Sequence, residues 1–422
     1  MKIPSSFLVA AVAANIHFVI PEVSAQAKKF VPNYDEAKIP DYVLPDPLEG
    51  VASADDWAKK RAEIFRLIER EMFGKAPRYS GEKIAFAEDI PSFEILDGRA
   101  RVSQPLLKIA GQDVRVLMIQ PANVSAKSAV PAIIGYNFGG NHTVMSDPRI
   151  ALGTVWGRGG EGERKAEDAE RGKSASRWAV ERIVDAGFAL MTIYYGDVDP
   201  DFDDGFKNGI FAQFPAPKPD EWGSIAGWAW GLSRVLDFLE QNDRGIDAKR
   251  VAVFGHSRLG KTSLWAGASD PRFALVISND SGCGGAALSK RAIGETVGRI
   301  NTVFPHWFCD NFQRYNENEA AMTFDAHMLL ALIAPRPLYV ASAEEDQWAD
   351  PHGEFLACVA ADPVYRLLGT DGLPQKEMPK VNEPIQGTIG YHIRTGKHDV
   401  TDFDWQQYLQ FAAKHLASGA GK

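Results

Sequence analysis

Residues 250–268 read Arg-Val-Ala-Val-Phe-Gly-His-Ser-Arg-Leu-Gly-Lys-Thr-Ser-Leu-Trp-Ala-Gly-Ala. Apolar residues that favour a buried strand lead into Gly255, and Ser257 stands directly before a stretch that favours a helix. A strand, a sharp turn and a helix are the context of a nucleophile elbow, which exposes a serine hydroxyl at the edge of a sheet. Gly255 leaves room for the turn, and the backbone amide of Arg258 at the helix N-terminus can stabilise an oxyanion.

Other interpretations of this stretch compete with the elbow. The usual elbow is Gly-x-Ser-x-Gly, whereas the second glycine here, Gly260, comes one residue late. The stretch also fits the phosphate-binding pattern Gly-x4-Gly-Lys-Thr, with Asp280 as the magnesium-binding acid. Bulky His256 and Arg258 flank the serine, however, where a phosphate loop favours small residues. A serine can also serve only as a helix cap. We favour the elbow because suitable partners for Ser257 follow it in the chain.

The rest of the chain alternates between strand and helix patterns. Val114–Gln120 alternates apolar and polar residues, which predicts a half-buried antiparallel edge strand. Later apolar runs are continuous, as in parallel strands covered on both faces: Ala132–Ile134, Phe188–Tyr194, Val251–Phe254, Leu275–Ile277 and Leu338–Ala341. Helices are predicted at residues 55–73, 174–186, 224–241, 260–268, 322–332 and 402–416. This order predicts an α/β fold, a three-layer α/β/α sandwich around a mostly parallel sheet.

Length, charge and the N-terminal residues limit the class of protein. The 422 residues are 45% hydrophobic and 24% charged, as in a globular protein. A net charge of -9 argues against binding nucleic acid or an anionic membrane through bulk charge. Residues 1–25 combine a short apolar run with a small-residue site, Val23-Ser-Ala25, which predicts a signal peptide and a secreted or periplasmic protein. We expect residues 26–90 to form an arm and a helix packed on a catalytic domain of residues 91–422.

Two further stretches and the three cysteines bear on an insertion, a metal site and a disulfide. Residues 153–173 are rich in glycine and charge, which predicts an exposed insertion loop. Aspartates recur between Asp197 and Asp204, but the EF-hand pattern fails because Asp204 replaces its turn glycine and Ile210 its terminal glutamate. We therefore expect a solvated loop that rims the cleft, and neither a metal nor another cofactor. Three cysteines fit no zinc pattern and permit at most one internal disulfide: Cys283, Cys309 and Cys358.

A serine nucleophile of this type needs a general base later in the chain. An α/β-hydrolase places its histidine in a loop after the last strand. His398 follows a short strand and a glycine turn and precedes the helix predicted at 402–416. We therefore predict that His398 is the base, with His352 and His392 as the alternatives.

The acid that orients the imidazole has two main candidates. Asp346 follows the predicted strand Leu338–Ala341, and Asp280 follows the preceding strand. Either carboxylate could stabilise the charged form of the base. Glu344 and Glu345 are weaker candidates, because a run of charges at a strand end is usually solvated.

The segment Gly255-His-Ser-Arg-Leu-Gly-Lys261 resembles the signature of glucuronoyl esterases, carbohydrate esterase family 15, in which the late glycine, the arginine and the lysine belong to the motif. The resemblance continues through Asp280-Ser-Gly-Cys-Gly-Gly, Ala334-Pro-Arg-Pro, Glu345-Asp-Gln-Trp348 and Gly396-Lys-His398. It implies an α/β-hydrolase fold and a serine esterase that cleaves the ester between a lignin alcohol and the 4-O-methyl-glucuronate of xylan. The insertion at 153–173 and His256 resemble bacterial members.

The resemblance also implies roles for single residues. Fungal relatives carry a glutamate where this chain has the shorter Asp280, and several bacterial relatives use an aspartate that matches Asp346, so we favour Asp346. The other implied roles are nucleophile for Ser257, base for His398, oxyanion contact for Arg258, contact with sugar hydroxyls for Lys261 and Glu295, and packing on the sugar for Trp348. Apart from the resemblance, Arg258 and Lys261 lie three residues apart on the opening helix, so both side chains can face the cleft.

A glycine-rich loop and two alternative functions stay open. Gly135-Tyr-Asn-Phe-Gly-Gly-Asn141 follows a predicted strand and either approaches the oxyanion or is a plain turn. A related esterase acting on acetyl or feruloyl groups of xylan is a second hypothesis, and a catalytically silent carbohydrate-binding protein is a third. We expect glucuronoxylan or a lignin–carbohydrate ester as the substrate, a monomeric chain, and neither a nucleic acid nor a membrane as partner.

Overall fold

A computed structural model describes residues 30–78, 81, 83–125 and 128–416. The chain divides after Val31, and the elements below belong to the part from Pro32 onward. The predicted signal peptide, residues 1–25, lies outside the described residues, and the domain boundary expected near residue 90 stays a prediction. Within the described ranges, no helix is long and apolar enough to cross a membrane.

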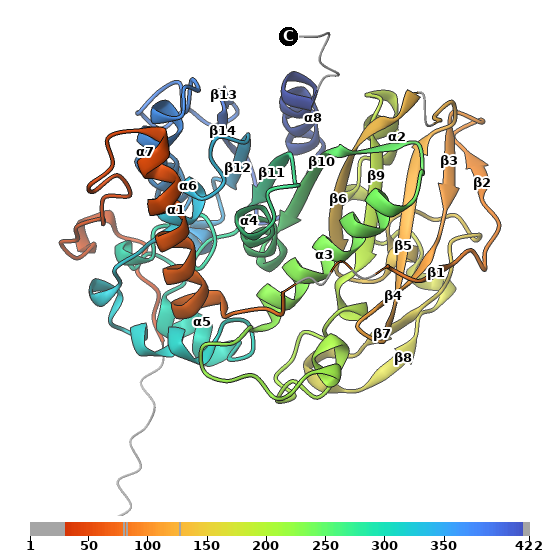
Figure 1. Cartoon of the computed structure of the whole chain (residues 1–422), viewed down its shortest axis with the longest axis horizontal. Helices are drawn as coiled ribbons and strands as arrows, with labels where there is room; N and C mark the ends of the chain where they lie inside the picture. The colour runs from red at the N-terminus through yellow and green to blue at the C-terminus, as the bar shows by residue number, and fades with distance from the viewer. Residues whose placement is uncertain (1–29, 79–80, 82, 126–127, 417–422) are drawn as a thin grey trace, which may run out of the picture. The chain divides into compact units, whose positions relative to one another are not determined.

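A central sheet organises this part of the chain (Figure 1). Its strands, within the described residues, follow the order β1-β4-β5-β9-β6-β10-β11-β12-β14-β13, and β3 joins β2 to β5. The bounds are β1 Phe86–Ala87, β2 Phe93–Ile95, β3 Ala100–Ser103, β4 Leu106–Ile109, β5 Gln112–Pro121, β6 Val130–Asn137, β9 Ala189–Tyr194, β10 Ile246–His256, β11 Leu275–Asn279, β12 Leu338–Ala343, β13 Ile385–Gln386 and β14 Ile389–Arg394. Along the sheet, the neighbouring strands β9, β6, β10, β11, β12 and β14 pair in parallel, which confirms the predicted mostly parallel sheet.

Helices cover both faces of the sheet. Their bounds are α1 Ala54–Ile68, α2 Val180–Asp185, α3 Ser224–Gln241, α4 Arg258–Ser269, α5 Val297–Val303, α6 Ala326–Ala331, α7 Pro351–Leu367 and α8 Asp402–Leu416. Val251 and Val253 of β10 belong to the same apolar cluster as α3 and α4, whereas Ala252 and Phe254 belong to a second cluster with α2 and α8. Because successive residues of a strand face opposite sides, this division shows the predicted three-layer sandwich.

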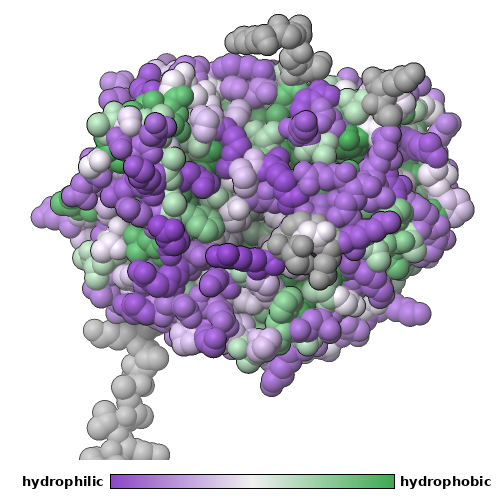
Figure 2. Space-filling model, viewed as in Figure 1, coloured by the Kyte–Doolittle hydropathy of each residue, from purple (hydrophilic) through white to green (hydrophobic). Residues whose placement is uncertain are grey.

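Hydrophilic residues predominate on the face of the molecule that carries α1 and α3, with apolar residues in small separate areas (Figure 2). This distribution fits a sandwich whose apolar side chains are buried between its layers.

Some expected elements differ from those observed. The strand predicted at Val114–Gln120 is antiparallel, but β5 lies between β9 on one side and β3 and β4 on the other, so it is not an edge strand. The helix predicted at 174–186 is a 3-10 turn, Ala175–Arg177, followed by the short α2. The expected insertion loop contains a hairpin of β7 (Thr154–Trp156) and β8 (Glu163–Lys165). Val155 of this hairpin is buried against Tyr194, which explains why the segment is ordered.

Candidate active site

Ser257 lies in the sharp turn between β10 and α4. Its backbone has φ +59° and ψ -127°, a conformation that is strained for a residue with a side chain. A Cβ atom at Gly255 would lie 1.8 Å from the carbonyl oxygen of Leu259, so only glycine fits there. A Cβ atom at Gly260 would lie 2.9 Å from the Cβ of Ser281, which gives the late glycine a packing role. The structure therefore has the elbow that the sequence predicts.

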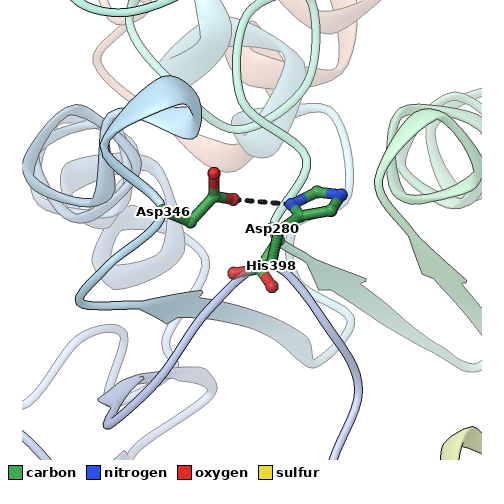
Figure 3. A group of neighbouring side chains, drawn as sticks. All are labelled: Asp280, Asp346 and His398. Carbon is green, nitrogen blue, oxygen red and sulfur yellow. Dashed lines mark hydrogen bonds and ion pairs between the residues drawn. The ribbon is translucent and has the colours of Figure 1, made fainter.

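His398 lies in the turn between β14 and α8 and faces Asp346, which follows β12 (Figure 3). Its Nδ1 is 2.6 Å from Oδ2 of Asp346. A carboxylate can only accept, so Nδ1 donates and the neutral ring keeps Nε2 free to take a proton. The His398 ring centroid is 4.5 Å from that of His256, the residue before Ser257. The base candidate and the elbow therefore lie side by side.

Asp280, the other acid candidate, directly follows β11 and is buried. One carboxylate atom each of Asp280 and Asp346 and one ring nitrogen of His398 lie within 4.8 Å of one another, so these residues could also hold a cation. The hydrogen bonds separate the two acids, because Oδ2 of Asp280 accepts from the backbone amide of Asp399 at 3.3 Å and lies 3.6 Å from Arg394. Burial, then the nearby charges of Glu354 and Asp346, raise the pKa of Asp280 well above its ordinary value.

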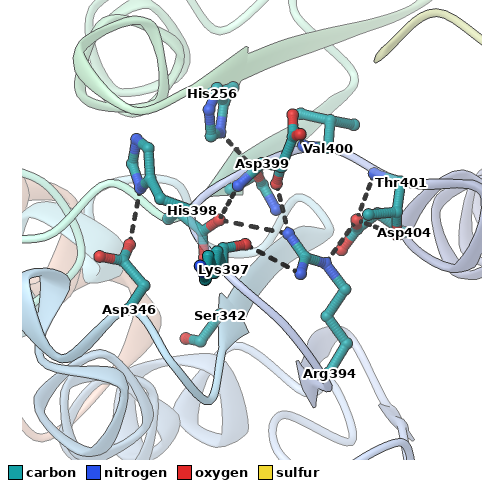
Figure 4. A network of polar contacts seen from close by, with 12 residues as sticks. His256, Ser342, Asp346, Arg394, Lys397, His398, Asp399, Val400, Thr401 and Asp404 are labelled. Carbon is teal, nitrogen blue, oxygen red and sulfur yellow. Dashed lines mark hydrogen bonds and ion pairs between the residues drawn. The ribbon is translucent and has the colours of Figure 1, made fainter. Parts of the chain in front are cut away.

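Arg394, at the end of β14, binds the turn that carries His398 (Figure 4). Its Nη1 donates to the carbonyl oxygens of Thr395 and Lys397 at 3.1 Å, and its Nη2 donates to that of Asp399. Its Nε donates to Asp404 of α8 at 2.7 Å. One buried guanidinium thus fixes the backbone on both sides of His398.

Arg258, directly after the nucleophile candidate, is held by Asp201. Its Nη1 donates to Oδ2 of Asp201, and Oδ1 of that carboxylate accepts from Trp307 Nε1 at 2.7 Å and lies 3.1 Å from His306 Nε2. The guanidinium carbon lies 4.9 Å from the Trp307 ring centroid and 5.8 Å from that of Phe138. These contacts fix the guanidinium of the residue that directly follows Ser257, and a fixed cation of this kind can stabilise an oxyanion.

The glycine-rich loop at 135–141 also reaches this site. The Phe138 ring lies 6.2 Å from the His256 ring and 5.6 Å from the Tyr195 ring, both in edge contacts. The loop therefore packs against His256, the residue before Ser257.

The loop between Asp197 and Asp204 was expected to be solvated, and this is wrong for Asp199 and Asp201, whose side chains are buried, whereas Asp203 is exposed. Burial raises the pKa of Asp197 to about 8 and raises that of Asp199 well above its ordinary value. Burial would also raise the pKa of Asp201, but the His306 hydrogen bond, the Arg258 charge and the Trp307 hydrogen bond lower it to about 2. Buried carboxylates need such partners, and in this loop Asp201 uses them to hold Arg258.

Lys261, Glu295 and Trp348 form a second group. The Nζ of Lys261 is buried and donates to the carbonyl oxygen of Ser281 at 2.6 Å, and burial lowers its pKa while the Glu295 charge opposes the shift. Burial raises the pKa of Glu295, which also has a side-chain hydrogen bond with Trp348. The backbone amide of Glu295 donates to the carbonyl oxygen of Trp348 at 3.1 Å. Trp348 as a whole residue is 36% exposed.

Glu354 of α7 is buried beneath these groups, and no motif in the sequence singles it out. Its Oε1 accepts from the backbone amides of Ser281 and Gly282 at 2.9 Å, and its Oε2 accepts from the Ser342 hydroxyl at 2.5 Å. Burial raises its pKa to about 7. Glu354 therefore supports the turn that follows Asp280. The carbonyl group bound by Lys261, that of Ser281, belongs to this turn.

The remaining candidates lie in other surroundings. His392 is fully buried in β14 between the Tyr339 hydroxyl and Asp404, and His352 pairs with Glu36, so neither is placed like a base. His398 bonds Asp346 and neither Glu344 nor Glu345, although the backbone amide of Glu345 donates to the carbonyl oxygen of Gly396 at 3.0 Å. Cys283, Cys309 and Cys358, which permitted at most one disulfide, all lie in the described part of the chain, where they are buried and free.

Together, the fold and these residues define an ester hydrolase of the serine type with an α/β-hydrolase fold. The model of the family "Glucuronyl esterase, fungi" matches residues 180–369. Carbohydrate esterase MZ0003 from an unknown prokaryotic organism is 49% identical in an alignment of 419 positions that covers 95% of this chain and 95% of its own. A 4-O-methyl-glucuronoyl methylesterase from Wolfiporia cocos is 26% identical over 83% of this chain and 77% of its own. The solved glucuronoyl esterase from Solibacter usitatus has 45% identity and a TM-score of 0.85 over 90% of this chain and all of its own.

This chain belongs to carbohydrate esterase family 15, the glucuronoyl esterases. The family resemblance expected from the elbow and the later motifs is confirmed, as is the α/β-hydrolase fold. The phosphate-loop interpretation of residues 255–262 is wrong, because Lys261 is buried on a backbone carbonyl group.

Proposed function

We propose that this esterase hydrolyses esters of 4-O-methyl-glucuronoyl side chains of glucuronoxylan with lignin alcohols, with Ser257, His398 and Asp346 as its triad. The observation that carries the proposal is the 2.6 Å hydrogen bond between His398 and Asp346 next to the strained elbow at Ser257. The name of the Wolfiporia cocos relative, a 4-O-methyl-glucuronoyl methylesterase, supports the choice of acyl group.

The proposed reaction proceeds through an acyl-enzyme. The Ser257 hydroxyl oxygen attacks the ester carbonyl carbon while Nε2 of His398 takes its proton, and Asp346 stabilises the imidazolium that forms. When the tetrahedral intermediate breaks down, His398 gives this proton to the leaving alcohol. Water then attacks the acyl-enzyme with His398 again as base, which releases the free uronic acid and restores Ser257.

Arg258 fits the step in which charge develops. The ester carbonyl group is neutral in the substrate and becomes an oxyanion in the tetrahedral intermediate, so a fixed guanidinium helps most in the transition state. Its ion pair with Asp201 and its position over Trp307 fix it before the substrate binds. Asp201 is therefore a positioning residue for Arg258 in this mechanism.

The neighbouring group suits a sugar. Glu295 offers a carboxylate that can accept hydrogen bonds from hydroxyl groups, and exposed Trp348 offers an apolar face to a pyranose ring. Lys261 already donates to a backbone carbonyl oxygen, so it uses its remaining hydrogens if it contacts the sugar. Carboxylate, amine and indole within one group favour a hydroxyl-rich acyl part over a simple acetyl group.

Hydrolysis of benzyl glucuronate tests the proposal. We expect turnover by the wild type and a loss of about 10³-fold or more in kcat for Ser257→Ala, because the nucleophile is removed. p-Nitrophenyl acetate and feruloylated xylan are the comparison substrates. A higher kcat/KM on either of these than on benzyl glucuronate would favour the acetyl or feruloyl esterase instead, and full activity of Ser257→Ala would contradict the proposed triad.

A further inference from the structure

Among the residues that the structure describes, few aromatic side chains have large exposed areas. Among the described residues they are Tyr34, which is 50% exposed, Phe86 and Trp348. Phe86 has ring partners, since it lies 5.0 Å from the Phe238 ring and under the Arg244 guanidinium at 4.9 Å. A single exposed aromatic residue needs no explanation, but Tyr34 and Trp348 both flank the segment that carries Glu295.

The arm that carries Tyr34 is bound to that segment. The carbonyl oxygen of Asn33 accepts a hydrogen bond from the amide of Gly294 at 2.8 Å. Two residues after Tyr34, Glu36 accepts from Arg291 Nη2 at 2.5 Å, and it lies 3.0 Å from Nδ1 of His352. A backbone hydrogen bond before Tyr34 and a side-chain ion pair after it thus hold the arm before any ligand binds.

Trp348 lies on the other side of the same segment. Gly294 has a positive φ of +61°, and a Cβ atom there would lie 2.4 Å from the carbonyl oxygen of Trp348. The next residue, Glu295, donates its amide to that same oxygen at 3.1 Å. The arm, residues 294–295 and Trp348 are therefore packed backbone to backbone, with no room for a side chain at position 294.

We propose that Tyr34 extends the sugar site of Glu295 and Trp348 into a subsite for the xylan main chain. This inference rests on the proposed function. Its ligand is a neutral β-linked xylosyl residue next to the one that carries the glucuronoyl branch. The C–H groups of a pyranose ring form an apolar face, which packs on an aromatic ring in the way that apolar surfaces do.

The chemistry of the arm favours this ligand over a charged one. No net charge is needed for packing on a phenol ring, and the charged side chains next to Tyr34 are paired, Asp35 with Lys38 and Glu36 with Arg291. Because the backbone of the arm is fixed, binding would order few groups, and little of the interaction would be lost to entropy.

Two benzyl esters with the same leaving alcohol test the proposal: benzyl glucuronate and a xylo-oligosaccharide whose 4-O-methyl-glucuronoyl branch is benzyl-esterified. For Tyr34→Ala, we expect the ratio of kcat/KM for the oligosaccharide ester to kcat/KM for benzyl glucuronate to fall about 3- to 10-fold. The fall should come from KM. Tyr34→Phe, which keeps the ring, should keep the wild-type ratio.

Val43→Ala is the matched control, because Val43 lies on the same arm and is 85% exposed. An unchanged ratio in Tyr34→Ala, or an equal fall in Val43→Ala, would overturn the subsite. Tyr34→Leu, which keeps an apolar side chain without the ring, gives the same test if the alanine variant is unstable. Failure of the wild type to hydrolyse benzyl glucuronate would instead contradict the proposed function, so the two failures are distinguishable.

Discussion

The turn after β11 and the turn after β12 each place an aspartate at the same edge of the sheet, within reach of His398. Asp346 faces the imidazole at 2.6 Å, whereas Asp280 faces the backbone amide of Asp399 and lies near Arg394. Position after a parallel strand therefore does not identify the acid. The hydrogen-bond partner separates the two, because Asp346 bonds the imidazole and Asp280 bonds the histidine turn, and in the proposed mechanism this gives the orienting role to Asp346.

The largest expected effect is that of Asp346→Asn. An amide at this position can donate to Nδ1 and favour the tautomer with its proton on Nε2, which cannot act as a base. It also leaves the imidazolium without a counter-charge. We expect kcat on benzyl glucuronate to fall about 10³- to 10⁴-fold with little change in thermal stability.

Glu345→Gln is the matched control for Asp346→Asn, because it removes a negative charge from the same turn at an exposed side chain. It should keep wild-type kcat. If Asp280→Asn lost as much activity as Asp346→Asn, the two turns would not differ in function and the comparison would fail.

Arg394→Lys tests the support of the histidine turn. Lysine keeps the positive charge near Asp280 and Asp404 but cannot donate at once to the three carbonyl groups that the guanidinium binds. A small displacement of His398 should lower kcat about 10- to 100-fold. We expect KM to change little, because the sugar group lies on other elements, and steady-state kinetics measure both.

Thermal unfolding of Arg394→Lys shows whether a loss of activity comes from a loss of stability. A fall in kcat at an unchanged Tm would locate the defect in the turn, whereas wild-type kcat in Arg394→Lys would show that the turn holds His398 without this residue.

Asp280→Asn should have a smaller effect. Burial and the neighbouring carboxylates raise the pKa of Asp280, so its neutral form is favoured more than in an ordinary aspartate, and an amide resembles that form. We expect kcat to fall less than about 10-fold, and the full pH profile of kcat/KM to keep its shape, because the base keeps its partner.

Local patterns in the sequence were sufficient for the elements that position the site. The helices predicted at 224–241 and 402–416 match α3 and α8 in their bounds, because each has a continuous apolar face of helical period. The elbow was recognisable because its turn requires glycine at position 255. The interior place of β5 was missed because Arg115 and Gln120 suggest a half-exposed strand, although Val116–Ile119 are buried on both faces.

Partners that are distant in the chain could not be predicted. Asp201 lies 57 residues from Arg258 and 106 from Trp307, so nothing in the spacing of the acidic loop shows that this aspartate is buried and paired. Arg394 binds three backbone carbonyl groups and Glu354 two backbone amides, and any residue type can supply such groups. A charged residue in a loop predicts solvation unless the fold brings partners to it, and such pairs need the structure.

The smallest expected effect concerns stability beneath the two turns. Burial raises the pKa of Glu354 from 4.5 to about 7, so the folded protein holds this proton more tightly than the unfolded chain. The stabilisation is fully present below about pH 4.5 and is lost as the pH rises through about 7, a change of up to about 3 kcal/mol.

Glu354→Gln removes the titration and leaves one oxygen to accept from Ser281 and Gly282. Between about pH 5 and 8, the Tm of the wild type should therefore fall by a few degrees more than that of Glu354→Gln. Parallel curves of Tm against pH for the two proteins would show that Glu354 keeps an ordinary pKa, and that its burial below the Asp280 turn does not make stability depend on pH.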